Sequence, residues 1–246
     1  MIVDPAPCRP EMHHMFARES EMAASASSWL TARGLVVKSE FVSPWGICDL
    51  VGVRFNPKHV AHRLGYRQTK RVASITRAAL LLEVPDLETG KSTSLKRMIR
   101  DCAPVIPEDI VVKEVQKLEA DGFVRRGPRG QLQKLNGWVP LQESLVAVEL
   151  KLSRIDEAMH QARQNLGFAD QSFVGLPADV ARRVAATSDR WSEFFDEGVG
   201  LLSVGKCRCK VLIPARKSPG WTDEAIQLYC VDKFWRGRGA SSGVWP

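Results

Sequence analysis

The sequence lacks a hydrophobic run long enough to cross a membrane, and it has few cysteines. A bilayer-spanning helix needs about 20 consecutive apolar residues, and the longest apolar stretches, such as 78–82, are far shorter. The N-terminus lacks the basic and apolar regions of a signal peptide, and six cysteines in 246 residues do not make a disulfide scaffold. The segment 200–206 (GLLSVGK) lacks the spacing of a Walker phosphate loop. We therefore expect a reduced, cytoplasmic protein that is neither membrane-bound nor an ATPase.

Charge is distributed unevenly along a chain whose composition is otherwise ordinary. Hydrophobic residues make up 44% and charged residues 26%, and the length suffices for one large domain or two small ones with real cores. Residues 57–138 hold 16 Lys+Arg and 9 Asp+Glu, whereas the rest of the chain holds 19 of each. The whole net charge of +7 therefore lies in one internal segment. This asymmetry predicts a module that meets a polyanion; a merely solvated basic face is the alternative.

Outside this basic segment, helices and strands alternate in the hydrophobic pattern. Apolar residues at helical spacing predict a first helix that ends before Gly34, and two apolar runs around Pro44-Trp45-Gly46 predict a hairpin. The order indicates an α/β fold with a mixed central sheet flanked by helices. The predicted elements are a helix over 11–33, strands over 35–43, 47–55 and 145–152, a helix over 155–166, a strand over 171–176, a helix over 178–197, and strands over 200–204 and 208–213.

The basic segment 57–138 is predicted to be an inserted domain, which leaves 1–56 and 139–246 as one discontinuous domain. Helices are predicted over 76–84, 94–102 and 107–121, followed by a hairpin of 123–126 and 131–135. This order resembles a winged helix-turn-helix, with VVKEVQKLEADGFVRR as its recognition helix and first wing strand. The resemblance implies DNA binding, although many winged helices bind only proteins. The candidate DNA-binding residues are Lys113, Lys117, Arg125, Arg126 and Arg129.

Three charged residues stand on strands otherwise built for burial. Glu149 and Lys151 alternate with Val148, Leu150 and Leu152, so both point to one face of the strand. Asp49 is the single charge in the strand around 47–53. Buried charge is costly unless it is paired or bound to a metal, and two carboxylates with main-chain carbonyls suit Mg²⁺. If the two strands are neighbours, these side chains converge at one edge, where the lysine can assist an attacking water or a charged phosphate.

These residues resemble the PD-(D/E)xK nuclease superfamily, with a restriction-endonuclease-like sheet. The match is Ile47-Cys48-Asp49-Leu50-Val51 for the aspartate strand and Val148-Glu149-Leu150-Lys151 for the E-x-K strand, with Cys48 in place of the motif's proline. The resemblance implies catalysis by Asp49, Glu149 and Lys151, Mg²⁺ as cofactor with Mn²⁺ expected to substitute, and a role for Gln161 on the following helix. It also implies an acidic metal ligand from the first helix, where periodicity selects Glu19 over Glu21.

The sequence thus predicts a metal-dependent endodeoxyribonuclease that hydrolyses DNA phosphodiester bonds and grips DNA with an inserted winged helix. Its partner is DNA, and a homodimer or a larger nucleoprotein complex is left open. The alternative function is a non-catalytic DNA-binding or assembly protein on a nuclease-like scaffold. Two local alternatives also stand: Glu149 and Lys151 as a charge pair on an exposed edge strand, and Glu19 as a helix cap or a solvated residue.

Overall fold

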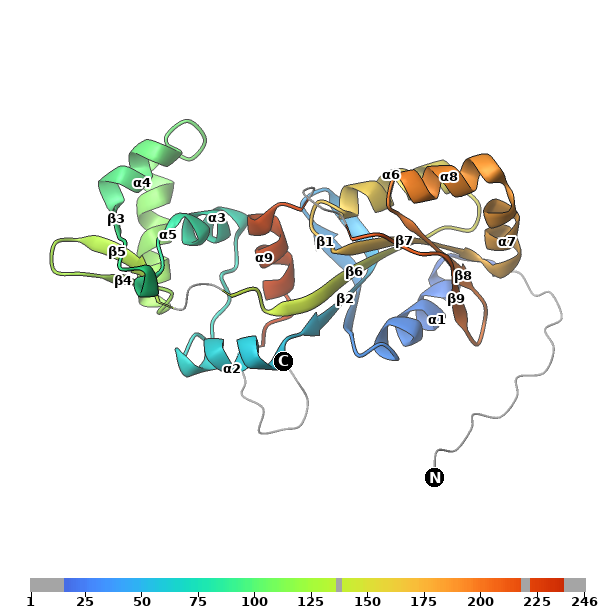
Figure 1. The fold of residues 1–246 in the computed structure, drawn as a ribbon, viewed down its shortest axis with the longest axis horizontal. Helices are drawn as coiled ribbons and strands as arrows, with labels where there is room; N and C mark the ends of the chain where they lie inside the picture. Colours follow the sequence, from blue (N-terminus) through green and yellow to red (C-terminus); the bar gives the residue numbers. More distant parts are fainter. Residues whose placement is uncertain (1–15, 136–138, 218–221, 237–246) are drawn as a thin grey trace, which may run out of the picture. The chain divides into compact units, whose positions relative to one another are not determined.

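The computed structural model describes residues 16–135, 139–217 and 222–236, which belong to two compact units (Figure 1). The first unit contains the described residues up to 52, together with 146–166 and 170–217. The second contains the described residues of 53–145, the short segment 167–169, and 222–236. Within the described part of the chain, no helix has both the length and the apolar character that crossing a bilayer requires.

A mixed six-stranded sheet runs in the order β1-β2-β6-β7-β8-β9, which confirms the predicted α/β class. The strands β6, β7 and β8 are parallel, whereas β9 is antiparallel to β8. The predicted hairpin is present as β1 and β2, and β6 lies third in the order, away from both edges. The strand bounds are β1 Val36–Ser43, β2 Gly46–Phe55, β6 Gln142–Leu150, β7 Gln171–Pro177, β8 Gly200–Val204 and β9 Cys209–Ile213.

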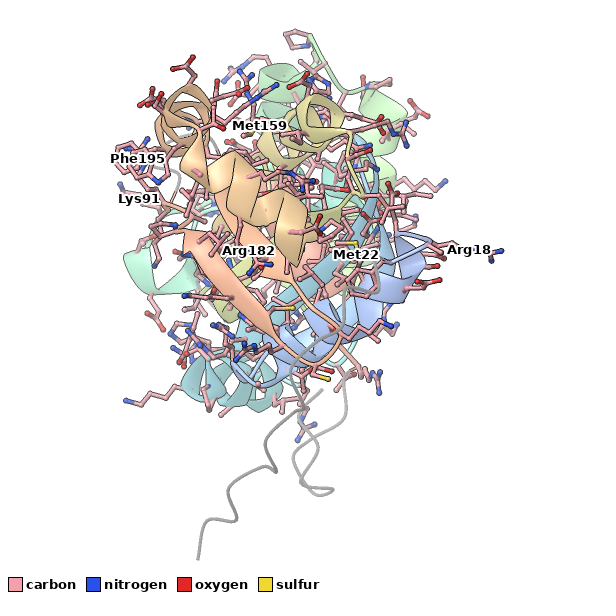
Figure 2. The ribbon with its side chains drawn as sticks, turned by 90° about the vertical axis from the view of Figure 1, so that its right-hand side faces the viewer. Arg18, Met22, Lys91, Met159, Arg182 and Phe195 are labelled. Atoms are coloured by element: carbon pink, nitrogen blue, oxygen red, sulfur yellow. The ribbon has the colours of Figure 1, made fainter. Side chains whose placement is uncertain are left out.

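Helices cover both faces of this sheet (Figure 1). Side chains alternate along a strand, so Phe173 of β7 packs in one apolar cluster and Val174 in another. The Phe173 cluster contains Met22 of α1 (Ser20–Thr31), and the Val174 cluster contains Met159 of α6 (Ile155–Asn165); both methionines are labelled in Figure 2. The helices α7 (Ala178–Ala186) and α8 (Ser188–Asp196) pack in the second cluster.

Two helices of the first unit differ from prediction. The helix predicted over 11–33 is α1, Ser20–Thr31; residues 11–15 lie outside the described part of the chain. The single helix predicted over 178–197 is divided at Thr187, whose backbone is extended (φ −92°, ψ 118°). Hydrophobic periodicity runs through this one-residue break, because a single extended residue barely disturbs it.

The described residues of the second unit form six helices, including one 3-10 turn, and a small antiparallel sheet in the order β3-β5-β4. Val111, Val115 and Leu118 of α5, predicted as its buried stripe, are buried in the core of this unit. The core also takes in side chains from α3, α4 and α9. The bounds are α2 Pro57–Gly65, α3 Ile75–Glu83, η1 Leu87–Thr89, β3 Thr93–Ser94, α4 Leu95–Cys102, α5 Glu108–Ala120, β4 Val124–Arg126, β5 Gln131–Lys134 and α9 Glu224–Asp232.

The division of the chain differs from the predicted one of 57–138 against 1–56 and 139–246. The boundary falls within β2 and β6, and the described residues 222–236 join the basic segment. A buried ion pair ties residues 222–236 to the basic segment. The guanidinium Nη1 of Arg63 lies 2.9 Å from Asp232 Oδ1, and both side chains are almost fully buried. Trp235 packs against the same guanidinium, 4.2 Å from ring centroid to Cζ. The helix α9 therefore completes the core of the second unit.

Candidate active site

Asp49 and Glu149 come from adjacent strands, and their carboxyls meet. Asp49 on β2 accepts a hydrogen bond at Oδ2 from the Leu150 amide of β6, at 2.7 Å, and its carboxyl lies near enough to that of Glu149 for each to affect the pKa of the other. Glu149 is only 2% exposed. The strands β2 and β6 are adjacent in the sheet, which the sequence alone does not establish. Their adjacency brings the two predicted carboxylates together.

Burial dominates the electrostatics of this acidic pair. Desolvation raises the pKa of Glu149 above its ordinary value, and the nearby Asp49 carboxylate raises it further, whereas the hydrogen bond from Asn165 opposes the shift. Desolvation likewise raises the pKa of Asp49, although the Leu150 amide and the Lys151 charge oppose it. Each carboxyl thus holds its proton more tightly than it would in water. A nearby positive charge would lower the free-energy cost of ionising the two carboxyls.

Lys151 follows β6 and places its ammonium group among carboxylates. The side chain is largely buried, and Nζ lies 3.5 Å from Glu157 Oε1 and 3.9 Å from Glu19 Oε2. Glu157 belongs to α6 and also pairs with the exposed Arg154. A buried ammonium is costly without such partners, so these contacts account for the lysine's position on an otherwise apolar strand.

Glu19 precedes α1 and lies near both Lys151 and Asp49, since its charge raises the pKa of the Asp49 carboxyl. Its Oε1 accepts a hydrogen bond from the Leu152 amide at 3.3 Å. It occupies the N-cap position of α1 but forms no side-chain capping bond there, so the capping alternative is wrong. Glu21 is exposed and accepts a hydrogen bond from the Ala17 amide. The two carboxylates therefore differ as periodicity predicts: Glu19 turns toward the E-x-K strand, and Glu21 toward solvent.

The alternative of an exposed edge strand is also wrong. The strand β6 has β2 on one side and β7 on the other, and Glu149 and Lys151 are both buried. A surface charge pair would cost little and need no explanation. Burying Glu149 in an inner strand and Lys151 directly after it is costly, which makes both residues candidates for a functional site.

The donor set fits a divalent cation in part. Among the described residues, no group of three or more His, Cys, Asp or Glu side chains could hold a metal ion. Asp49 and Glu149 provide two adjacent carboxylates, and Mg²⁺ is commonly bound by one or two carboxylates with water completing its shell. Glu19, predicted as a third ligand, instead contacts the lysine and a main-chain amide. The residues at hand thus suit Mg²⁺ held by Asp49 and Glu149.

Asn165 is the neighbour of Glu149 that sequence reasoning missed. It lies one helical turn after Gln161 on α6 and donates from Nδ2 to Glu149 Oε1 at 2.7 Å. The Oε1 atom of Gln161 is buried and has no hydrogen-bond partner among the described residues. Asn165 shares a helix face with Ala158 and Ala162, which are both buried. A polar residue on such an apolar face is the sequence signal that could have identified it.

The predicted DNA-binding residues differ in how far their charge is already balanced. Lys113, Arg125, Arg126 and Arg129 are exposed, but Arg126 forms two hydrogen bonds with Glu119, at 2.8 and 2.6 Å. Lys117 lies 2.8 Å from Glu114. Arg125 donates to the neutral Gln133. Among the described residues, Lys113, Arg125 and Arg129 therefore form no ion pair and leave their charge available.

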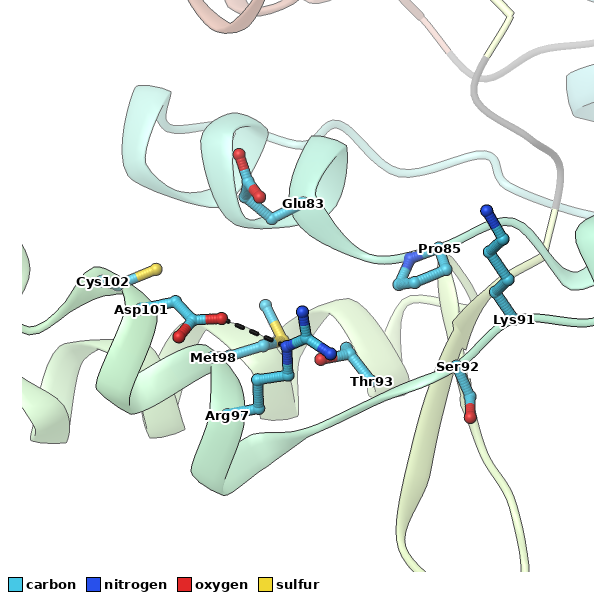
Figure 3. A pocket seen from close by; sticks show the side chains of 9 residues that line it. All are labelled: Glu83, Pro85, Lys91, Ser92, Thr93, Arg97, Met98, Asp101 and Cys102. Atoms are coloured by element: carbon cyan, nitrogen blue, oxygen red, sulfur yellow. Dashed lines mark hydrogen bonds and ion pairs between the residues drawn. The ribbon is translucent and has the colours of Figure 1, made fainter.

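A cavity of about 450 Å³ lies in the second unit beside α4 (Figure 3). Arg97 and Asp101 of α4 pair with each other at its wall. Its described lining includes none of the predicted site residues. The residues that line it are Glu83, Pro85, Lys91, Ser92, Thr93, Arg97, Met98, Asp101 and Cys102.

Comparisons with known proteins leave the family open. No protein-family model matches the sequence, and no curated protein matches it. Among solved structures, an SPO1766 protein of unknown function from Silicibacter pomeroyi aligns with 88% of this chain and 82% of its own, at 13% identity and a TM-score of 0.41. A likeness at this level bears on neither fold nor function.

Proposed function

We propose that the protein is a metal-dependent endodeoxyribonuclease of the PD-(D/E)xK kind, with a winged helix that binds DNA. The observation that carries the proposal is the meeting of Asp49 and Glu149 on adjacent strands, with Lys151 two residues beyond Glu149. Paired acidic groups of raised pKa and a buried lysine are costly to a fold and useful to phosphodiester hydrolysis.

In this proposal Asp49 and Glu149 bind Mg²⁺, with Mn²⁺ able to substitute. The bound ion would stabilise the charge that develops on the phosphate and make water a better nucleophile. Lys151 places a fixed positive charge beside the carboxylates, where it can stabilise the same transition state. Glu19 and Glu157 hold its ammonium group. Glu19 is then a residue that positions Lys151, rather than the third metal ligand that the resemblance implies.

The second unit supports the winged-helix part of the proposal. Its helix α3 is followed by β3, α4, α5, β4 and β5, and β5 lies between β3 and β4. Three helices with a three-stranded sheet in that order are the expected arrangement of a winged helix-turn-helix. The exposed Lys113 on α5 and Arg129 in the β4–β5 turn would then face DNA phosphates.

Plasmid cleavage with purified variants tests the nuclease activity. Asp49→Asn and Glu149→Gln keep the side-chain volume but remove a carboxylate. We expect each to lower the Mg²⁺-dependent rate by 100-fold or more, because a bound ion contributes several kcal/mol and about 1.4 kcal/mol is worth tenfold. Lys151→Met should lose cleavage but retain more metal affinity. Glu19→Gln should reduce the rate, and its exposed neighbour Glu21→Gln is the matched control.

The outcome also separates the two candidate functions. A wild-type protein that binds DNA but leaves plasmid intact in both Mg²⁺ and Mn²⁺ would favour a non-catalytic DNA-binding or assembly protein. Cleavage that continues in EDTA, or at the wild-type rate in Asp49→Asn, would refute the site assignment.

A further inference from the structure

The amide of Asn165 is a buried polar group at the end of a helix whose buried side chains are otherwise apolar. Asn165 is 4% exposed and ends α6, whose Ala158, Met159 and Ala162 pack in the apolar cluster beneath the sheet. A buried amide is costly unless it is hydrogen-bonded. Its Nδ2 donates to Glu149 Oε1 at 2.7 Å and also approaches Cys48 Sγ, at 3.5 Å. The contact with Glu149 is thus the shorter of the two that accommodate this amide.

The neighbouring thiol is itself fixed. Cys48 is buried, and its Sγ hydrogen-bonds the carbonyl oxygens of Leu50, at 3.3 Å, and Val148, at 3.6 Å. The Asn165 amide thus lies between a carboxylate and a sulfur atom that main-chain groups of β2 and β6 hold in place. Cys48 stands where the motif has proline, so this support is particular to this chain's residues.

A neutral donor orients a carboxylate without cancelling its charge. A lysine or arginine at this position would pair with Glu149 and compete with a cation. An amide donates to one carboxylate oxygen, restricts rotation of the group, and brings no positive charge that would compete with a metal ion. This is what a metal-binding carboxylate needs from its neighbour.

We propose that Asn165 is a positioning residue that fixes the Glu149 carboxylate for a divalent metal ion. The inference rests on the proposed function, and it adds a residue that the E-x-K resemblance does not supply. Because Asn165 would orient the carboxylate for metal binding, its effect on metal affinity can be measured without DNA.

Metal binding to the full-length chain tests it. Asn165→Leu keeps the branched shape of the side chain, although it is somewhat larger, and removes the donor. Mn²⁺ titration by calorimetry, without DNA, should show affinity 10- to 100-fold weaker than wild type, which is the usual cost of losing a group that orients a metal ligand. The metal dependence of plasmid cleavage should shift by the same factor, and the rate should recover at saturating metal.

Two variants of α6 serve as controls. Met159→Ala removes a buried side chain of the same helix and destabilises the fold without touching the amide. Gln164→Leu changes the exposed residue next to Asn165. Both should bind Mn²⁺ as wild type does.

Three results would overturn the inference. If Asn165→Leu binds Mn²⁺ as tightly as wild type while wild type cleaves DNA, Asn165 is structural and the nuclease proposal stands. If Met159→Ala weakens Mn²⁺ binding as much as Asn165→Leu, affinity merely follows stability. If the wild-type protein binds no Mn²⁺ and cleaves no DNA, the proposed function fails and this inference fails with it.

Discussion

The basic residues of the second unit allow a quantitative prediction of how DNA binding depends on salt. Each phosphate contact on duplex DNA contributes about −0.9 to the slope of log affinity against log salt, because counterions are released. Lys113, Arg125 and Arg129 form no ion pair with another described residue, so we expect them to make such contacts. Replacing all three by alanine should flatten the slope by about 2.7. Between 50 and 200 mM salt, wild type should therefore lose about 40-fold more affinity than the triple variant.

Lys117 and Arg126 provide the matched comparison. Lys117 pairs with Glu114, which also pairs with Arg77, and Arg126 pairs with Glu119. Breaking these pairs would offset part of the free energy gained from a phosphate contact. Replacing both by alanine should change the slope less than the triple variant does. Fluorescence anisotropy of a labelled duplex, in EDTA to prevent cleavage, measures both slopes.

An unchanged slope in the triple variant would refute this reasoning. The winged-helix module would then not hold DNA, and its basic face would fit an acidic protein partner better. The nuclease proposal would survive that result, because Asp49 and Glu149 belong to the first unit.

Much of the candidate site could be predicted because it depends on short-range pattern. The turn at Pro44-Trp45-Gly46 and the alternation around Glu149 each involve fewer than ten residues, and strand periodicity fixes which side chains share a face. The burial of Glu149 does not follow from this pattern, because the apolar residues that alternate with it lie on the opposite face. Glu149 faces α6, whose Asn165 it contacts. The contact between Asp49 and Glu149 likewise needed the order of the strands, which the sequence does not state.

Two features of the second unit were not predicted: the helix α2, and the pairing of Arg63 with Asp232. The sequence analysis predicts no helix at the start of the basic segment, yet Asn56 caps α2 there by accepting hydrogen bonds from the Lys58 and His59 amides. Proline after a capping residue begins a helix as readily as it marks a loop. The pairing of Arg63 with Asp232 spans 169 residues, and no local pattern reports a partner so far away.

The sequence shows that the segment 57–138 is basic, but it does not show which of its basic residues are exposed to a partner. Arg63, Arg77 and Lys134 are buried and pair with acidic residues inside the second unit. These three cations stabilise the fold rather than attract a polyanion. Net charge alone therefore overstates the basic surface that a partner meets.

Two further predictions concern stability. Asp232→Ala removes the carboxylate that pairs with Arg63, and both side chains are almost fully buried, so urea denaturation should show a loss of about 3–5 kcal/mol in the free energy of unfolding. A loss below about 1 kcal/mol would contradict the ion pair's role. Glu149→Gln should be more stable than wild type at pH 7. Burial raises the pKa of Glu149, so between the unfolded and folded pKa values the native state binds more protons than the unfolded state, and wild-type stability falls as pH rises through that interval. Glutamine does not titrate, so the advantage of Glu149→Gln should grow from pH 4 to pH 7, as measured by denaturation at each pH. An advantage that stays constant across this range would mean that Glu149 titrates in the folded protein as it does in water, and the electrostatic argument for a metal at this carboxylate would lose its basis.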